Sequence, residues 1–488
     1  MNRQLPYLAD LEKSGTPTVL IDLEEETAKV KHDALIYGIP ELRVIEASRT
    51  LPGPEDVDKW IEQLVQQLTK PLTAKEKKGG TWAPDEPRVL FEGSLEEAEE
   101  FYNQTENIPG ILNAPFAKYT DGLPVTIPTE ERVKEMLSGT SHRPDEVITI
   151  QRTVEVPSTS AITSAYTKKR GDVVRFMPMY RSATVEQVAV NAVMAGCKPE
   201  YFPVVLAIAE SGGGTGDGRG GGGAFLVSGP IYKEIGMNVG HGRLSIGNPP
   251  NMAIGRVGSL LWRNLGGYKE TVTTIMTYGN PVTKGGFILA EYAEALPPGW
   301  LGLNEEMGYR KDESIIMPIA PGEWGMGQEH APGVYRSLQK SGHGGIARFL
   351  GVKGLPGPHN YIDFIIDGIW RTHEGGFTLV FVPQMAHDMY NYGFKSKKAI
   401  YEYMWKKSFE PLGQYRLRGT PDIRTNGWMG IEKTSGKHWK ELPDDYMVPA
   451  GGDDPFASYC IIVCDGQETS SQRFAGGHGQ SYSIDAWR

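Results

Sequence analysis

The sequence has few cysteines and no long apolar run. Three cysteines in 488 residues are too few for a disulfide scaffold, so we expect a reducing, cytoplasmic setting. The longest apolar runs, such as YCIIVC, are far shorter than a membrane-spanning helix. The N-terminal stretch MNRQLPYLADLEKSG lacks the apolar core of a secretory signal. We therefore expect no membrane association.

Positive charge is also scarce. The formal net charge is −10, and no basic stripe is long enough to follow a phosphate backbone, so we expect no nucleic-acid partner. Hydrophobic residues make up 39% and charged residues 23%, which is ordinary for globular proteins with large cores. The partners expected are a small-molecule substrate and either further copies of the chain or a separate subunit.

Strand and helix patterns alternate along the chain. Residues 17–22 (PTVLID) and 42–47 (LRVIEA) predict strands, and residues 54–70 predict a helix with proline at its start. This order is typical of parallel α/β units. We expect a multi-domain α/β protein with mixed or parallel sheets flanked by helices. The predicted parts are an α/β domain at 1–72, a linker at 73–87, and two further α/β domains at 88–320 and 321–488.

The two larger regions show further periodic segments. Apolar residues at helical spacing predict helices within 184–196 and 248–267, and 199–210 predicts a second helix or a buried strand. The other predicted strands are 88–93, 224–230, 273–279, 286–292, 314–321, 378–384 and 459–466, and the other predicted helices are 24–38, 94–104, 129–137 and 396–409. The aromatic residues of the C-terminal tail predict that it docks on its own chain or a neighbouring subunit.

Several segments resemble a known family. The stretches TDGLPVTIPTEERV (120–133), NAVMAGCKPEYFPVVLA (191–207) and GNPPNMAIGRV (247–257) resemble a bacterial family associated with selenocysteine-Gly-Ser-Cys (UGSC) proteins. The N-terminal LEKSGTPTV (11–19) resembles the later part of the UGSC domain. The resemblance implies a fusion of two pieces and a thiol-linked reaction. The family's redox motif stands before LEKSGTPTV, where this chain has no cysteine.

Cys197 is the first candidate for chemistry. It precedes Pro199, a predicted helix start, and unpaired N–H groups at a helix N-terminus lower a thiol pKa. Glu200 is a candidate acid or base. The alternative for Cys197 is a small buried apolar residue. Asn191 and Tyr201, in the same stretch, are candidate substrate-binding residues.

Cys460 and Cys464 belong to a predicted strand. At about 3.3 Å per residue their Cα atoms are about 13 Å apart on one face, too far for a disulfide or a shared metal ion. Cys464 ends the strand, and strand ends are where α/β sheets build their sites. Cys464 is therefore the better candidate of the two.

Residues 238–251 (NVGHGRLSIGNPPN) predict a small-anion site. Arg243 can hold a carboxylate or phosphate with two hydrogen bonds, and the helix expected near Pro250 attracts anions at its N-terminus. Asn248 and Asn251 are candidate substrate-binding residues, although Asn251 can instead cap the helix. His241 is a candidate general acid or base.

Five histidines cluster in the later part of the chain. His330 and His387 are candidate catalytic acids or bases, and the candidate metal ligands are His330, His343, His359 and His373, with Glu323 or Glu329 as a carboxylate ligand. A metal ion is the one cofactor that the sequence suggests. The glycine-rich run at 211–223 matches no phosphate-binding motif and is interpreted as a flexible loop or lid.

These residues predict an enzyme that acts on a small polar or anionic organic substrate, with a thiol-linked oxidoreductase as the first interpretation. One alternative is a metal-dependent lyase or hydratase that uses the clustered histidines. Another is a non-catalytic subunit of a heteromeric thiol enzyme. The enzyme hypothesis requires Cys197, Arg243 and a later histidine to lie around one cleft between the regions 88–320 and 321–488.

Overall fold

The computed structural model covers the whole chain and describes most of it. Among the residues that it describes, no helix is both long and apolar enough to cross a membrane. The description leaves out residues 1–4, 25–26, 28–29, 32–33, 35–37, 40, 49–52, 79–87, 108–114, 157–165, 178–180, 213–223, 269–285, 320–328, 331–361, 364–375, 418–431, 433–434, 450–453 and 467–471.

Two small mixed sheets form the centre of the molecule. In the first, β7 (Ala224–Ser228) runs parallel to β8 (Phe287–Ala290) on one side and antiparallel to β9 (Ile315–Pro318) on the other. The second sheet repeats this arrangement. There β11 runs parallel to β14 and antiparallel to β15, and the three strands span Phe377–Phe381, Tyr459–Val463 and Gln472–Ala475.

Each sheet receives a two-residue strand from the other half of the chain. The strand β10 (Glu329–His330) follows the first sheet in sequence but pairs with β15 of the second. Conversely, β16 (Tyr482–Ser483) follows β15 and pairs with β9 of the first sheet. The two halves therefore share one topology and exchange their last strands. Sequence analysis found no repeat, because the topology recurs without a short sequence period.

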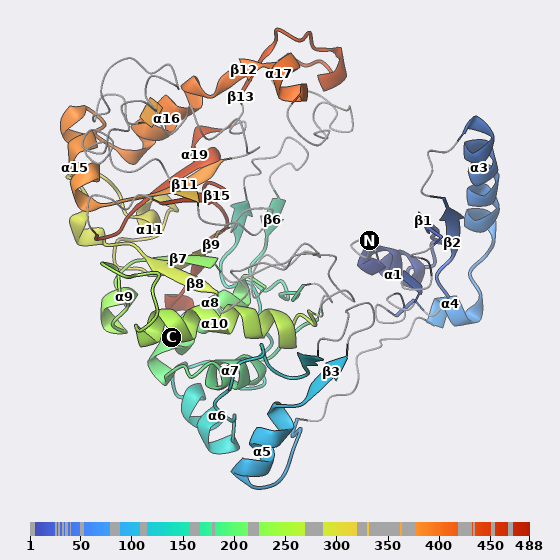
Figure 1. Cartoon of the computed structure of the whole chain (residues 1–488), viewed down its shortest axis with the longest axis horizontal. Helices are drawn as coiled ribbons and strands as arrows, with labels where there is room; N and C mark the ends of the chain where they lie inside the picture. Colours follow the sequence, from blue (N-terminus) through green and yellow to red (C-terminus); the bar gives the residue numbers. More distant parts are fainter. Residues whose placement is uncertain are drawn as a thin grey trace.

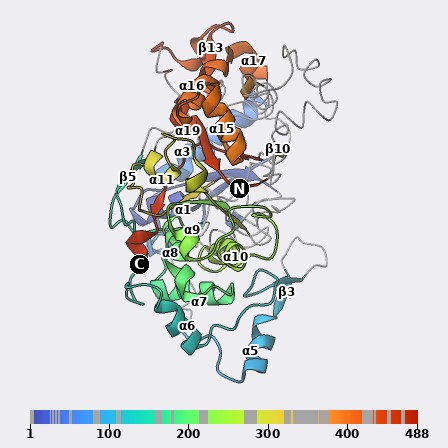
Figure 2. The same cartoon turned by 90° about the vertical axis from the view of Figure 1, so that its left-hand side faces the viewer.

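Helices cover the outer face of each sheet, and the inner faces pack together, so the core has four layers (Figures 1 and 2). Strand alternation separates the layers: Phe225 and Val227 face the first helix layer, whereas Leu226 faces the second sheet. The first helix layer contains α7 (Val185–Met194), α8 (Phe202–Glu210) and α10 (Pro249–Asn264), and the second contains α15 (Pro383–Tyr392) and α16 (Lys397–Lys407).

The two sheets touch at their edge strands, β8 and β14. The backbone N–H of Tyr292 donates to the carbonyl of Val463 at 2.7 Å. The thiol of Cys464 donates to the carbonyl of Ala290 at 3.3 Å. Since β7, β8, β11 and β14 are the parallel strands of the two sheets, their carboxyl ends meet along the line where β8 touches β14, which we call the seam. This confirms the predicted mixed α/β fold.

The other described elements are shorter. The remaining helices are α1 (Leu5–Lys13), α3 (Pro54–Thr69), α4 (Ala74–Lys78), α5 (Leu95–Tyr102), α6 (Glu130–Leu137), α9 (Ile231–Glu234), α11 (Leu303–Glu306), α17 (Leu412–Leu417) and α19 (Pro455–Ser458), with 3-10 turns η2 (Pro199–Tyr201), η4 (Ala293–Ala295), η5 (Trp439–Glu441) and η6 (Asp485–Trp487). The remaining strands pair as β1 (Leu20–Leu23) with β2 (Val44–Ala47), β3 (Thr105–Asn107) with β4 (Pro115–Ala117), β5 (Val154–Val156) with β6 (Tyr166–Lys168), and β12 (Phe409–Pro411) with β13 (Met447–Pro449).

The N-terminal region has its own small core around the parallel pair β1 and β2. Arg43 precedes β2, and its guanidinium donates to the carbonyls of Gln67 and Lys70 at the end of α3. The same group pairs with Glu76 of α4 at 2.7 Å. Part of the predicted linker 73–87 is thus helical and packed, while the domain boundaries stay predictions.

Two local predictions are wrong. Residues 88–93 form no strand, and Arg88 instead pairs with Glu186 at 2.7 Å. The cap of α10 is Asn248 rather than Asn251, because the Asn248 side chain accepts the N–H of residue 251. The predicted strand 273–279 and most of the predicted helix 24–38 lie outside the described residues.

The C-terminal tail docks on its own chain, as predicted. Trp487 is fully buried against the first helix layer, and its indole N–H donates to Glu210 at 2.7 Å. Burial raises the pKa of Glu210 to about 7, against the opposing hydrogen bonds from Gln151 and Trp487. A buried carboxylate of α8 therefore anchors the end of the tail.

Candidate functional site: a buried charged cluster at the seam

A cluster of charged side chains fills the seam between the two sheets. The Lys397 ammonium, at the start of α16, lies 2.9 Å from Glu291 and 3.2 Å from Glu306. Glu291 follows β8, and Glu306 ends α11. None of the three side chains is more than 7% exposed. One cation therefore joins carboxylates from separate parts of the first half to a helix of the second.

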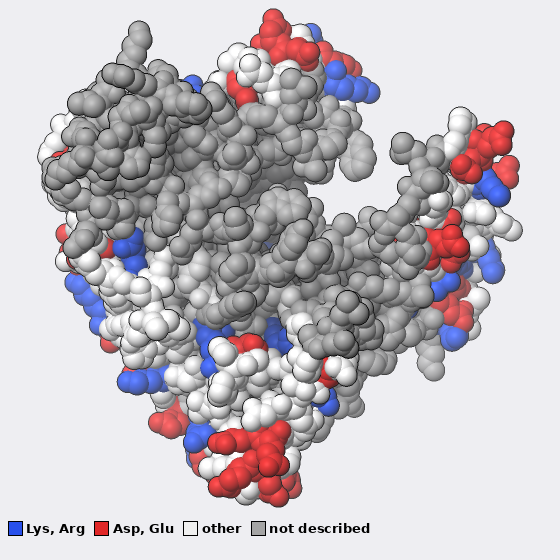
Figure 3. Space-filling model, viewed as in Figure 1, with Lys and Arg blue, Asp and Glu red and all other residues white. Residues whose placement is uncertain are grey.

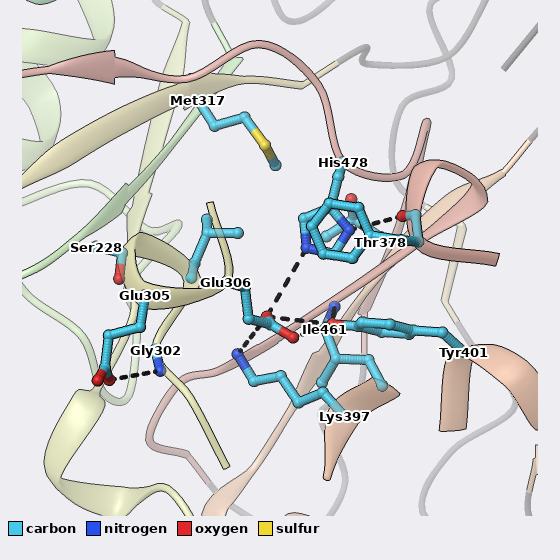
Figure 4. Close-up of polar contacts among 12 residues, drawn as sticks. Ser228, Gly302, Glu305, Glu306, Met317, Thr378, Lys397, Tyr401, Ile461 and His478 are labelled. Atoms are coloured by element: carbon cyan, nitrogen blue, oxygen red, sulfur yellow. Dashed lines mark hydrogen bonds and ion pairs between the residues drawn. The ribbon is translucent and has the colours of Figure 1, made fainter. Parts of the chain in front are cut away.

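Figure 4 shows Lys397, Tyr401 and His478 pointing toward Glu306. Lys397 and Tyr401 are four residues apart and so share one side of α16. The Tyr401 hydroxyl donates to Glu306 at 3.3 Å and accepts the N–H of Ile461 at 3.1 Å. That N–H belongs to the edge strand β14, so the tyrosine also caps an open strand edge.

His478 lies on the opposite side of Glu306. Its Nδ1 is 2.8 Å from the carbonyl of Phe456, and its ring stacks on the Phe456 ring with centroids 3.9 Å apart. Its Nε2 is 3.8 Å from Glu306, too far for a hydrogen bond. The carbonyl requires a proton on Nδ1, and Nε2 is then the ring nitrogen nearer to the Glu306 carboxylate.

A second set of hydrogen bonds fixes Glu291. Its Oε2 accepts the Ser228 hydroxyl at 2.8 Å and the N–H of Leu303 at 2.7 Å. Asn304 closes the network, because its N–H donates to the Ser228 hydroxyl at 3.1 Å. Ser228 ends β7, and Glu291 follows the neighbouring parallel strand β8, so the network forms at the carboxyl edge of the sheet.

Coulombic interactions keep these groups charged. Burial opposes ionisation of Lys397 and Glu306, but the opposite charges outweigh it, so the pKa of Lys397 is raised and that of Glu306 is lowered. Burial also opposes the charged form of His478, yet Cys460 and Glu306 raise its pKa to about 10. Two cations thus face two carboxylates in a dry environment.

Cys197, the first candidate of the sequence analysis, is not part of this cluster. Its side chain packs against the first helix layer, and burial raises the pKa of its thiol, with Arg256 as the partly opposing charge. The burial of the thiol therefore argues against an activated thiolate at this position. Glu200 is exposed and lies 3.8 Å from Lys198. A surface pocket of about 480 Å³ includes Glu200, Glu234 and Arg488 in its lining.

Arg243 reaches the seam, but not Cys197. Its guanidinium donates to the carbonyl of Asp465 at 2.9 Å, directly after Cys464. Burial raises the pKa of the Cys464 thiol to about 12 in spite of Arg243, which argues against a reactive thiol there. The Asn251 amide donates to the carbonyls of Asn238 and Arg243. The 238–251 turn is thus held by its own asparagines.

The other predicted site residues lie apart from the cluster. Asn191 is buried, donates to the carbonyl of Gln187 and accepts the Asn264 amide, so it joins α7 to α10. Tyr201 is buried in the core, whereas His241 and His387 are exposed. Among the residues that the structure describes, Cys197, Arg243 and a later histidine are not brought together around one cleft.

The clustered histidines remain largely untested. His343, His359 and His373 lie outside the described residues, as does Glu323. His330 and Glu329 form β10, and their side chains are not described. Within the described part of the chain, no group of three or more His, Cys, Asp or Glu side chains is arranged to hold a metal ion. The metal-dependent alternative stays a prediction.

Sequence analysis missed Lys397, Tyr401, Glu291 and Glu306. Lys397 stands in SKKAIYEYMWKK, where a buried lysine looks like any surface lysine at a helix start. Glu291 gave a clearer signal, because a charged residue directly follows the apolar strand FILA. His478 was noted only as a histidine among glycines in the tail.

The chain matches no protein-family model, and comparisons with curated proteins and with solved structures find no match. The resemblance to the UGSC-associated family stays a prediction.

Proposed function

We propose that the chain is an enzyme that acts on a small polar or anionic organic substrate at the seam, with Cys460 as its thiol nucleophile. The supporting observation is that Cys460 is fully buried and interacts electrostatically with both the His478 imidazole and the Lys397 ammonium. A thiol that has a base and a cation in its surroundings has the groups that nucleophilic chemistry uses.

The arrangement has three of the parts that nucleophilic catalysis needs. Cys460 supplies the nucleophile, His478 the proton donor or acceptor, and the carbonyl of Phe456 orients the imidazole through Nδ1. Lys397 and His478 also favour an anionic group in the substrate. A thiol reaction agrees with the oxidoreductase interpretation, but it uses Cys460 rather than Cys197.

Both reacting side chains are buried, so a substrate reaches them only when the seam opens. At the seam the edge strands β8 and β14 are joined by the Tyr292–Val463 and Cys464–Ala290 hydrogen bonds rather than by a continuous ladder, so we propose that opening occurs there. Opening there separates the halves along the line where Glu291 and Glu306 meet Lys397.

Alkylation of the full chain tests the proposal. We expect iodoacetate, which is anionic, to modify Cys460 faster relative to iodoacetamide than it modifies Cys197, because Cys460 has two cationic neighbours. The modified cysteine is identified by peptide mass spectrometry. In His478→Gln this preference should fall, whereas the exposed control His387→Gln should keep it. An unmodified Cys460, or a preference unchanged in His478→Gln, contradicts the proposal.

A further inference from the structure

Helix α3 in the N-terminal region has an exposed apolar face. Val57, Ile61, Val65 and Leu68 are 39%, 52%, 57% and 45% exposed, and no side chain of this described helix is buried. Their spacing of four, four and three residues places them on one side of the helix. Figure 1 shows α3 at the outer end of the N-terminal region.

Charges are distributed unevenly along the same helix. Its first turns hold three acidic residues, Glu55, Asp56 and Asp58, against one lysine, Lys59, and Lys70 follows its last residue. The short helix α4 at the foot of α3 adds the exposed residues Lys75 and Lys77. In Figure 3 the lobe that contains α3 has acidic side chains at its upper tip. The acidic end and the basic end of α3 are therefore complementary to each other.

We propose that α3 is a homodimer interface at which a second copy of the chain packs antiparallel against the face formed by Val57, Ile61, Val65 and Leu68. A two-fold axis midway between Ile61 and Val65 places Val57 opposite Leu68 of the partner subunit. The same axis places the acidic first turn near Lys70 of the partner subunit. A parallel arrangement would instead place the acidic first turns of the two copies against each other.

The expected dimer is weak. Covering four half-exposed aliphatic side chains on each copy only modestly exceeds the cost of association. A helix of 16 residues is about 24 Å long, so the contact is at the small end of specific interfaces. Dissociation should therefore be observable by dilution in the micromolar range.

Sedimentation of the full chain over a range of concentrations tests this proposal independently of the thiol chemistry. We expect a monomer–dimer equilibrium that Ile61→Glu weakens at least about tenfold, because a charge then enters the apolar contact. Gln63→Glu makes the same charge change on the far side of α3 and should leave dimerisation intact. Lys70→Glu should weaken it, as should added salt.

Circular dichroism of each variant shows whether α3 remains folded, and the exposure of Ile61 makes misfolding a poor explanation for a lost dimer. A chain that is monomeric at every concentration overturns the proposal and leaves this face for a different partner. So does a dimer that Ile61→Glu leaves unchanged.

Discussion

The ammonium nitrogen of Lys397 lies 2.9 Å from Oε1 of Glu291, and neither side chain is exposed. The two residues belong to different halves of the core, so this contact connects the halves at the seam. Removing one member of a buried ion pair leaves an uncompensated charge, which costs about 3–5 kcal/mol. The pair is therefore expected to matter more for stability than any surface pair of the protein.

Lys397→Met should lower the free energy of unfolding by about 3–5 kcal/mol, because Glu291 and Glu306 would lose their shared cation. Urea denaturation measures the change. Lys398→Met, at the exposed neighbouring position, is the control and should cost less than about 1 kcal/mol. Equal effects of the two substitutions would show that the buried contact contributes nothing.

His478 should make stability fall in alkaline solution. Its pKa is raised to about 10 in the folded chain, above about 6.5 for an unfolded histidine. The native state thus binds the proton more tightly than the unfolded chain. The stabilisation that this proton provides is complete below about pH 6.5 and is lost as the pH rises through about 10. Denaturation midpoints between pH 6 and 10 measure it, and His478→Gln should flatten the profile relative to His387→Gln.

Glu210 should make the stability of the chain depend on pH in the acidic to neutral range. Its pKa is raised to about 7, so the folded chain binds a proton that an unfolded glutamate releases near pH 4.5. Stability is expected to fall by up to about 3 kcal/mol between pH 4.5 and 7 on account of this group. Glu210→Gln should remove that part of the slope in the same denaturation series. An unchanged slope would place the Trp487 contact in a wetter setting than the structure shows.

Arg43 should hold the N-terminal region together. Its hydrogen bond lowers the pKa of Glu76 to about 2. The stabilisation from the Arg43–Glu76 pair is therefore present above about pH 4.5 and is lost as the pH falls through about 2. Arg43→Met should increase amide hydrogen exchange in β2, α3 and α4, because it removes both the ion pair and the cap of α3. Lys75→Met removes only the exposed pair with Glu41 and should change exchange little. Equal exchange in the two variants would contradict this role.

Local patterns in the sequence predicted most elements of the core. The apolar runs of β7, β8, β11 and β14 and the helical spacing of apolar residues in α7 and α10 were sufficient for this, because those signals depend on neighbouring residues. The exchange of β10 and β16 was not predictable, since a two-residue strand has no periodicity and its partner lies far away in sequence. Arg88 shows the same limit: the strand pattern of 88–93 gave no sign that its first residue would pair with Glu186.

The candidate site was less predictable than the fold. Cys464 was correctly placed at a strand end, whereas Arg243 was predicted only as an anion-binding residue in the 238–251 turn. Charged residues such as Lys397 are far more often exposed than buried, so residue type alone argued against placing them in a buried site. Cys460 was ranked below Cys464 because its neighbours His478 and Lys397 come from distant segments.

The central claim is that Cys460 is the reacting thiol of the chain and that His478 controls its reactivity. Alkylation of the full chain with iodoacetamide, followed by peptide mass spectrometry, tests the claim most directly. We predict that Cys460 is modified, that its modification slows in His478→Gln, and that it is unchanged in the exposed control His387→Gln. A Cys460 that stays unmodified, or that is modified at the same rate in all three proteins, would contradict the claim.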